Sequence, residues 1–141
     1  MKLTSRGKYS IQAMLDIAQH SNGKAVKLQD ISQRQSISLF YLEQLFRKLR
    51  QANVVKSVRG PGGGYVLAKS AEDIKIGNIL AGVKEVLDYS NNIKLSETAT
   101  DEQKVMAKFA GSLSNSVKSI LDCSLASLLE VATSLNNEEK Q

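Results

Sequence analysis

The stretch that most constrains this chain is residues 58–66, Val-Arg-Gly-Pro-Gly-Gly-Gly-Tyr-Val, which holds the only proline and four of the nine glycines. Glycine allows positive φ angles and proline fixes φ at about −65°, so this run can continue neither a helix nor a strand ladder. Apolar alternation flanks it at residues 54–58 and 65–67. The pattern predicts the tip of a β-hairpin, with Arg59 at its root, that can approach another molecule closely.

Charge is divided unevenly between the two halves of the chain. Residues 1–70 contain twelve Lys and Arg against three Asp and Glu, a formal charge of +9, whereas residues 71–141 carry −4. This division favours a polyanion as the partner of the first half only. A basic surface that merely faces solvent is the alternative that charge alone leaves open.

Other features argue against a membrane or secreted protein. No run of about 18 apolar residues is present, which disfavours a membrane span. Residues 1–6 lack the apolar centre of a signal peptide. The single cysteine, Cys123, excludes an internal disulfide and suits a reducing, cytoplasmic location.

The chain begins with an amphipathic helical pattern. Thr4 and Ser5 are candidate N-caps, and the turn residues 21–23 end the pattern. Apolar residues recur at helical spacing, and polar residues fall on the opposite side. The predicted inward residues are Ile11, Met14, Leu15 and Ala18, and the outward ones are Lys8, Gln12 and Asp16.

A helix-turn-helix follows this first helix. A short helix over residues 28–35, a tight polar break and a third helix capped by Ser38 and reaching residue 51 give that arrangement. Together with the hairpin of residues 54–67 it predicts a winged helix-turn-helix domain over residues 1–70. The inward face of the third helix consists of Leu42, Leu45, Phe46 and Leu49.

Residues 71–135 predict a helical dimerisation or effector region. A helix with Ile79, Leu80, Val83 and Val86 or Leu87 inward precedes a polar loop over residues 88–100. A long helix over residues 101–122, a short helix to residue 132 and a disordered tail over residues 136–141 follow. The predicted fold class is therefore mostly α with a small β-hairpin wing and a long C-terminal dimerisation helix.

The long helix carries an apolar stripe with nearly heptad spacing. The preceding domain already has its own core, so we expect the stripe to pack against a second copy in a homodimer. Packing back on its own chain is the alternative. The stripe consists of Met106, Phe109, Leu113, Val117 and Ile120.

A helix-turn-helix binds DNA by placing the start of its second helix in the major groove. Gln44 can pair with adenine, Glu43 can accept from the cytosine amino group, and Phe40 can touch a thymine methyl. A helix salt bridge from Glu43 to Arg47 is the competing interpretation. The predicted base-facing residues are Ser38, Phe40, Tyr41, Glu43 and Gln44.

Other basic residues are candidates for phosphate contacts, which position a protein without specifying sequence. Arg59, followed by Gly60 and Pro61, is predicted to enter a minor groove, where narrow A·T tracts concentrate negative potential. A merely flexible loop is the alternative for this tip, and the absence of a following Gly-Lys-Ser/Thr disfavours a P-loop. The phosphate candidates are Lys8, Lys48, Arg50 and Lys56.

Residues 3–9, 37–46 and 57–65 form three blocks, Leu-Thr-Ser-Arg-Gly-Lys-Tyr, Ile-Ser-Leu-Phe-Tyr-Leu-Glu-Gln-Leu-Phe and Ser-Val-Arg-Gly-Pro-Gly-Gly-Gly-Tyr. These blocks resemble the Rrf2 family of dimeric winged-helix transcription regulators, and the resemblance extends from Met1 to about Asp88. It implies a homodimer built on the long helix, an inverted-repeat operator and a wing in the minor groove. It also implies control of iron–sulfur biogenesis or related stress genes.

The resemblance fails at the sensor of the family's iron–sulfur regulators, which carry three cysteines and a histidine before and at the start of the long helix. The corresponding positions here are Asn92, Thr98, Lys104 and Ala107. Clusters need thiolates, so we expect no cofactor held by the usual ligands and no metal site. Cys123 is expected to be a small buried residue rather than a redox switch, and His20 a surface residue.

Three functions remain open at this stage. The chain can be a regulator that acts constitutively without a cluster, a regulator signalled by a protein partner or small molecule at its acidic half, or a winged-helix protein-interaction module. Gln44, Arg59 and the glycine tip disfavour the module. An enzyme is least expected, because one histidine, one cysteine and scattered carboxylates assemble no nucleophile–base pair or metal triad.

Overall fold

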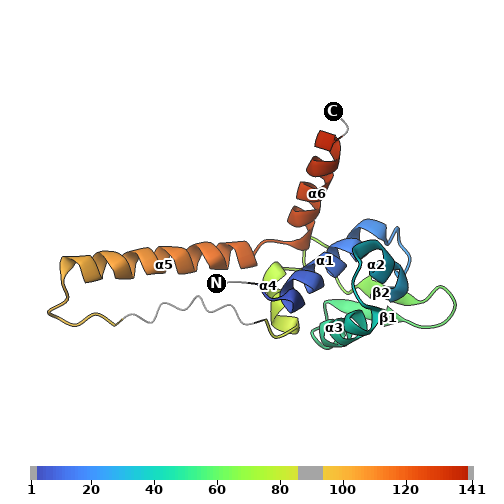
Figure 1. Ribbon diagram of the computed structural model, residues 1–141, viewed down its shortest axis with the longest axis horizontal. Coiled ribbons are helices and arrows are strands. Elements are labelled where there is room, and N and C mark those ends of the chain that lie inside the picture. Colours follow the sequence, from blue (N-terminus) through green and yellow to red (C-terminus); the bar gives the residue numbers. More distant parts are fainter. Residues whose placement is uncertain (1–2, 86–93, 140–141) are drawn as a thin grey trace.

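The computed structural model describes residues 3–85 and 94–139 as a succession of helices interrupted by one hairpin (Figure 1). The predicted fold class, mostly α with a small β-hairpin wing, is confirmed. Among the described helices, none is both long and apolar enough to cross a membrane. The elements are α1 (Ser5–His20), α2 (Leu28–Gln35), α3 (Leu39–Gln51), β1 (Val55–Val58), β2 (Gly64–Leu67), α4 (Ile76–Gly82), α5 (Asp101–Leu121) and α6 (Leu125–Glu139).

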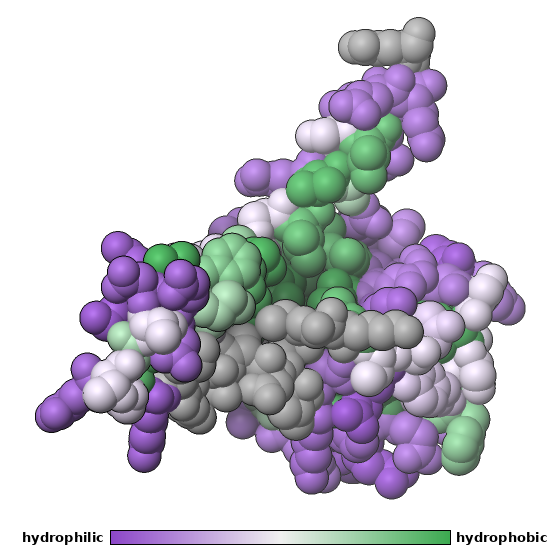
Figure 2. Space-filling view, turned by 60° about the vertical axis from the view of Figure 1, so that its left-hand side comes forward, coloured by the Kyte–Doolittle hydropathy of each residue, from purple (hydrophilic) through white to green (hydrophobic). Residues whose placement is uncertain are grey.

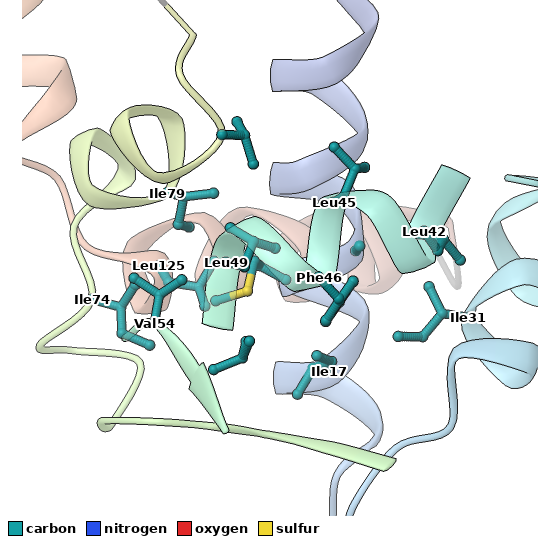
Figure 3. Packing of buried hydrophobic residues seen from close by; sticks show 14 of the residues in the cluster. Ile17, Ile31, Leu42, Leu45, Phe46, Leu49, Val54, Ile74, Ile79 and Leu125 are labelled. Carbon is teal, nitrogen blue, oxygen red and sulfur yellow. The ribbon is translucent and has the colours of Figure 1, made fainter. Parts of the chain in front are cut away.

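The inner face of α3 lies in the middle of the buried core. All four of its predicted inward residues are at most 2% exposed, and Phe46 is the largest of them. They belong to one cluster with Ile17 of α1, Ile31 of α2 and Ile79 of α4 (Figure 3). Full burial of one such side chain contributes about 1.5–3 kcal/mol. This face therefore holds α3 in place and turns its outer face to solvent.

The buried face of α1 is rotated from the predicted one. Met14 is fully buried as expected, but the buried side centres on Ala13 and Ile17. Asp16, predicted to face outward, is only 1% exposed. The remaining predicted inward residues, which are Ile11, Leu15 and Ala18, are only partly buried.

Hydrogen bonds from α2 explain why Asp16 is tolerated inside. Arg34 donates from Nη2 to Oδ1 of Asp16 at 2.7 Å and from Nε to Oδ2 at 3.0 Å, and Gln35 Nε2 donates to Oδ2 at 2.8 Å. Burial raises the pKa of Asp16, but these hydrogen bonds and the Arg34 charge outweigh it and hold that pKa below its ordinary value. The two-pronged contact fixes α2 against α1.

The core continues across residue 70, the predicted boundary between two regions. Ile74, Val83 and Leu125 belong to the same buried cluster as the first three helices. Within the second region, backbone hydrogen bonds join the start of α4 to the start of α6, from Ile76 N to Cys123 O at 2.9 Å and from Leu125 N to Ile74 O at 2.8 Å. The segment around α4 and the start of α6 thus complete the core of the N-terminal half.

The helix α5 stands away from the body of the molecule (Figure 1). It begins at a capping box, in which Thr100 Oγ1 accepts from Gln103 N at 3.1 Å and Gln103 Oε1 accepts from Thr100 N at 2.8 Å. It ends at Leu121, and none of its residues, all of which are described, is buried. The predicted inward position at Val86 or Leu87 lies outside the described residues.

The last helix, α6, is longer than predicted. It runs from Leu125 to Glu139, so the tail predicted to be disordered from residue 136 is helical as far as it is described. The reason is that neither glycine nor proline interrupts residues 125–139, and the other residues there tolerate a helix. The charged residues after position 136 therefore do not end the helix.

Candidate nucleic-acid interface

The turn between α2 and α3 fixes where α3 begins. Ser36 ends α2 in the left-handed conformation at φ 55°, and Ser32 Oγ donates to Ile37 O at 2.5 Å. Ser38 then caps α3, because its Oγ accepts from Tyr41 N at 3.4 Å. Ser38 is exposed, which places this predicted contact residue at the open N-terminal end of α3.

One exposed stripe runs along the outer face of α3. Because an α-helix turns by about 100° per residue, four residues share this face, and all of them are exposed. Phe40, at 69% exposed, stands out as a large apolar residue without cover. The residues of the stripe are Phe40, Glu43, Gln44 and Arg47, and those on its flanks are Lys48, half-buried, and Arg50, exposed.

The competing interpretation of Glu43, an ion pair with Arg47, does not correspond to the structure. Within the described ranges the side-chain ion pairs are Arg6–Glu85, Arg34–Asp16 and Lys75–Asp122. Glu43 and Arg47 are both exposed, and neither has an ion-pair partner among the described residues. The predicted contact residues did not include Arg47. Its central place on the stripe makes it a further candidate.

Tyr41 differs from the stripe residues because it is half-buried. Its ring meets that of Tyr9 on α1 edge-on, with 5.9 Å between the ring centroids and 82° between the ring planes. Edge-to-face pairs of this kind are favourable for aromatic rings. Tyr41 therefore joins the start of α3 to the start of α1, a contact that periodicity could not reveal.

Glycine and proline build a tight turn at the hairpin tip. Gly63 N donates to Gly60 O at 2.9 Å across the turn. Pro61 and Gly62 occupy its two central positions, with Gly62 at φ +74°, which is the pattern of a type II turn. Arg59 and the two residues after it are exposed. The described part of the chain offers Arg59 no ion-pair partner.

The root of the hairpin is fixed to α3 and to the segment before α2. Tyr65 on β2 packs its ring against that of Phe46 on α3, with 4.8 Å between centroids. Tyr65 N donates to Val26 O at 2.8 Å, and Val26 N donates to Tyr65 O at 2.9 Å. A Cβ atom at Gly64 would collide with the Val26 carbonyl. The hairpin and α3 therefore keep a fixed relation to each other.

The positions that the sequence resemblance assigns to cluster ligands do not fit an iron–sulfur cluster. Thr98 and Lys104 are exposed and Ala107 is half-buried, but none of them supplies a thiolate, and Asn92 lies outside the described residues. Within the described ranges no three His, Cys, Asp or Glu side chains could hold a metal ion together. Cys123, expected to be buried, is exposed at the junction of α5 and α6.

A second uncovered surface is the apolar stripe of α5. An apolar groove of about 580 Å³ adjoins its C-terminal end, between α1, α4, α5 and α6, with Leu80 and Leu128 in its lining. Figure 2 shows apolar side chains gathered in the hollow between α5 and α6. The predicted dimerisation residues are Met106 (55% exposed), Phe109 (55%), Leu113 (53%), Ile120 (64%) and the partly exposed Val117.

The chain is similar to known transcription regulators in sequence and in structure. The IscR regulator of Vibrio atlanticus (strain LGP32), described as an HTH-type transcriptional regulator, is 60% identical over 88 residues, which are 62% of this chain and 51% of that protein. The chain thus spans about half the length of the curated relatives it matches. Among solved structures, T. potens IscR is 39% identical at a TM-score of 0.69, with coverage of 94% of this chain and 88% of that one.

A second similar structure is CymR of B. subtilis, described as its global cysteine regulator. It is 28% identical at a TM-score of 0.73, and the match covers 93% of this chain and 98% of that one. These relatives are named as regulators and not as enzymes. The family model Rrf2, described as an iron-dependent transcriptional regulator, matches residues 3–131. Because that match includes nearly the whole chain, this protein belongs to the Rrf2 family of transcriptional regulators.

Proposed function

We propose that this chain is a sequence-specific DNA-binding transcription regulator that acts as a homodimer on an inverted-repeat operator. The proposal rests on two exposed surfaces held in fixed relation, the outer stripe of α3 and the wing tip with Arg59, which the Phe46–Tyr65 contact joins. The +9 charge of residues 1–70 supplies attraction to phosphates. Those residues are the proposed DNA-binding domain, and residues 71–135 the proposed dimerisation or effector region.

The start of α3 is proposed to enter the major groove. There Gln44 pairs with adenine, Glu43 accepts from the cytosine amino group, and Phe40 contacts a thymine methyl. Ser38 and Tyr41 lie at the same end of the helix, beside the nearer DNA strand. A carboxylate that faces phosphates is unfavourable, so Glu43 lowers the affinity for sites that lack the matching cytosine.

Basic residues around this helix are proposed to hold the DNA backbone. Lys48 and Arg50 flank the stripe on either side and contact phosphates, which set the register. Arg59 enters the adjacent minor groove, where its charge favours narrow A·T-rich sequences. Gly60 and Pro61 let the backbone of the wing approach the groove because they present little side chain.

The exposed stripe of α5 supports the proposed homodimer. Exposed apolar surface costs about 25 cal/mol for each Å² that burial would remove from water. A second α5, packed along the stripe and against the adjoining groove, would bury it. Two-fold symmetry would then present two copies of α3 to major grooves about 34 Å apart.

The signal is proposed to be something other than a cluster held in the usual way, because Thr98, Lys104 and Ala107 provide no thiolate. The acidic half of the chain is the candidate site for a protein or small-molecule signal. Genes of iron–sulfur biogenesis or related stress responses are the proposed targets, in keeping with the iron-dependent description of the family. Stoichiometric iron and a visible absorption band after anaerobic purification would contradict the cluster-free part of this proposal.

Selection from a random-sequence duplex library tests DNA recognition. The purified full chain is expected to enrich an inverted repeat and to bind it about a thousandfold more tightly than random DNA. This affinity should fall steeply as salt rises, because counterions are released from the phosphates. Enrichment of no sequence, or an affinity insensitive to salt, would show that the chain is not such a regulator.

Two variants then separate base reading from phosphate contact. Arg59→Ala should weaken binding by about 1–3 kcal/mol on sites with an A·T-rich wing position and less on others. Glu43→Ala should relax the base preference at one position while raising the affinity for random DNA. The matched controls are Lys108→Ala and Glu72→Ala, which remove exposed charges away from this surface. Equal losses on all sequences would reduce Arg59 to a phosphate contact.

A further inference from the structure

Glu85 is a carboxylate held against the start of α1. It is 7% exposed. Thr4 N donates to its Oε1 at 2.7 Å, Thr4 Oγ1 donates to its Oε2 at 2.5 Å, and Arg6 Nη2 lies 3.6 Å from Oε2. Thr4 is the N-cap residue of α1, yet its side chain does not cap the helix locally. The hydroxyl is used instead to bind a residue 81 positions away.

Gly7 is the residue that makes this approach possible. It lies inside α1, where glycine is less favourable than alanine by about 1 kcal/mol. A Cβ atom there would lie 3.1 Å from Glu85 Cδ and 3.2 Å from Leu80 Cδ2, closer than ordinary contact. This glycine in the first turn of α1 thus coincides with the place where Glu85 packs on the helix.

The helix α1, which Glu85 contacts, also contacts α3. Tyr9, on the next turn after Thr4, packs edge-on against Tyr41 at 5.9 Å between ring centroids. Lys8, beside it, is exposed and is a candidate phosphate contact. Glu85 therefore lies at one end of a run of contacts whose other end is the first turn of the proposed recognition helix.

We infer that Glu85 is a positioning residue for DNA binding, which holds the start of α1 so that Lys8 and the Tyr9–Tyr41 pair are correctly placed on the duplex. The inference rests on the proposed function. Glu85 acts through α1 and does not touch DNA, because it is buried and a carboxylate is repelled by phosphates. Glu85 lies three residues after the end of α4 at Gly82.

The negative charge of Glu85 suits this place. The N-terminus of a helix carries partial positive charge, which attracts a carboxylate. Hydrogen bonds from the side chain and backbone of Thr4 hold the pKa of Glu85 below its ordinary value, although burial opposes them, and the Arg6 charge adds to the effect. Glutamine at this position keeps the shape of the side chain but loses the charge, which makes it the informative substitution.

Glu85→Gln in the full chain tests the inference, with Glu72→Gln as the control because Glu72 is exposed. The probe is the duplex that the wild-type chain selects from a random-sequence library. Glu85→Gln should lose about tenfold in affinity, and its salt dependence should become shallower by about one phosphate contact. The control should change neither. If the wild type selects no duplex, the proposed function and this inference both fail.

A double-mutant cycle distinguishes positioning from a loss of folded protein. If Glu85 acts through Lys8, Glu85→Gln should add little in a Lys8→Ala background, so the two losses will not be additive. Full additivity with an unchanged salt slope, in a wild type that does bind, would overturn the inference alone. If Glu85→Gln does not fold, Thr4→Val must give the same shallower salt dependence of DNA binding, and Thr4→Ser must keep the wild-type salt dependence. The inference fails if they do not.

Discussion

The helices α3 and α5 are both amphipathic, but they use their apolar faces in opposite ways. The apolar face of α3 is completely buried, and the residues left outside are those proposed to meet DNA. The apolar stripe of α5 is uncovered, and none of its residues is buried within the chain. The same kind of pattern thus corresponds to a buried face in α3 and to an exposed face in α5.

An apolar pattern in the sequence specifies less than a contact. Periodicity indicates which face of a helix avoids water, but it does not name the surface that will cover this face. For α3 the cover comes from α1, α2 and α4 of the same chain. For α5 we propose that it comes from a second copy. Substitutions of the same residue type in the two helices can test this distinction directly.

The strongest loss of stability is expected when a phenylalanine of α3, and not one of α5, is removed. Phe46→Ala should lower the free energy of unfolding by about 3–5 kcal/mol, because Phe46 is fully buried and its loss leaves a cavity. Phe109→Ala should change it by about 0.5 kcal/mol or less at protein concentrations low enough to favour monomers. Denaturant unfolding measures both values. A large loss for Phe109→Ala in the monomer would mean that α5 packs on its own chain.

The next largest effect concerns association. Phe109→Glu should weaken homodimerisation by about 2 kcal/mol or more, since it places a charge at the centre of the proposed interface. Asn115→Glu is the matched control, because Asn115 lies on the opposite side of α5 and is exposed. Analytical ultracentrifugation gives the dissociation constants. If Phe109→Glu associates as tightly as the control, the stripe is not the dimer interface.

Much of the fold could be predicted because short-range patterns determine it. The inward residues of α3 follow directly from helical spacing, and the wing follows from the dense glycine and proline between two apolar segments. The length of α6 was underestimated, since its polar residues suggested an end that no helix-breaking residue enforces. Local pattern therefore identified elements better than it identified their limits.

The contacts between elements could not be predicted in this way. Asp16 looks like a solvent-facing residue when α1 is considered alone, and only its distant partner Arg34 makes burial tolerable. Glu85 and Gly7 present the same difficulty, because a glycine in a helix gives no indication of the carboxylate that packs on it. The chemistry of the candidate site could be predicted from residue types, whereas its support depends on pairs far apart in sequence.

Acid should loosen the part of the molecule that holds α3 before it affects α5. The pKa values of Asp16 and Glu85 are both lowered by folding, so their stabilising contributions are complete above unfolded-state pKa values of about 4 and are lost as pH falls through the folded-state values. Hydrogen exchange at falling pH should therefore show protection lost first in α1 and α2. Asp16→Asn should make the protection of α1 and α2 less dependent on pH. If the pH dependence of exchange is unchanged in this variant, Asp16 does not have this role.

The smallest expected effect concerns the wing that stands beside α3. Gly62→Ala forces a side chain into a positive φ of 74°, which should cost about 1 kcal/mol of stability. Gly23→Ala imposes a similar strain at φ 79°, and neither position has an atom within 4 Å of the added Cβ. Both variants should thus lose similar stability in thermal unfolding, but only Gly62→Ala should weaken binding to the selected duplex, by about fivefold. Equal DNA affinities would mean that the tip adds nothing to recognition by α3, and the outer stripe would then have to account for binding alone.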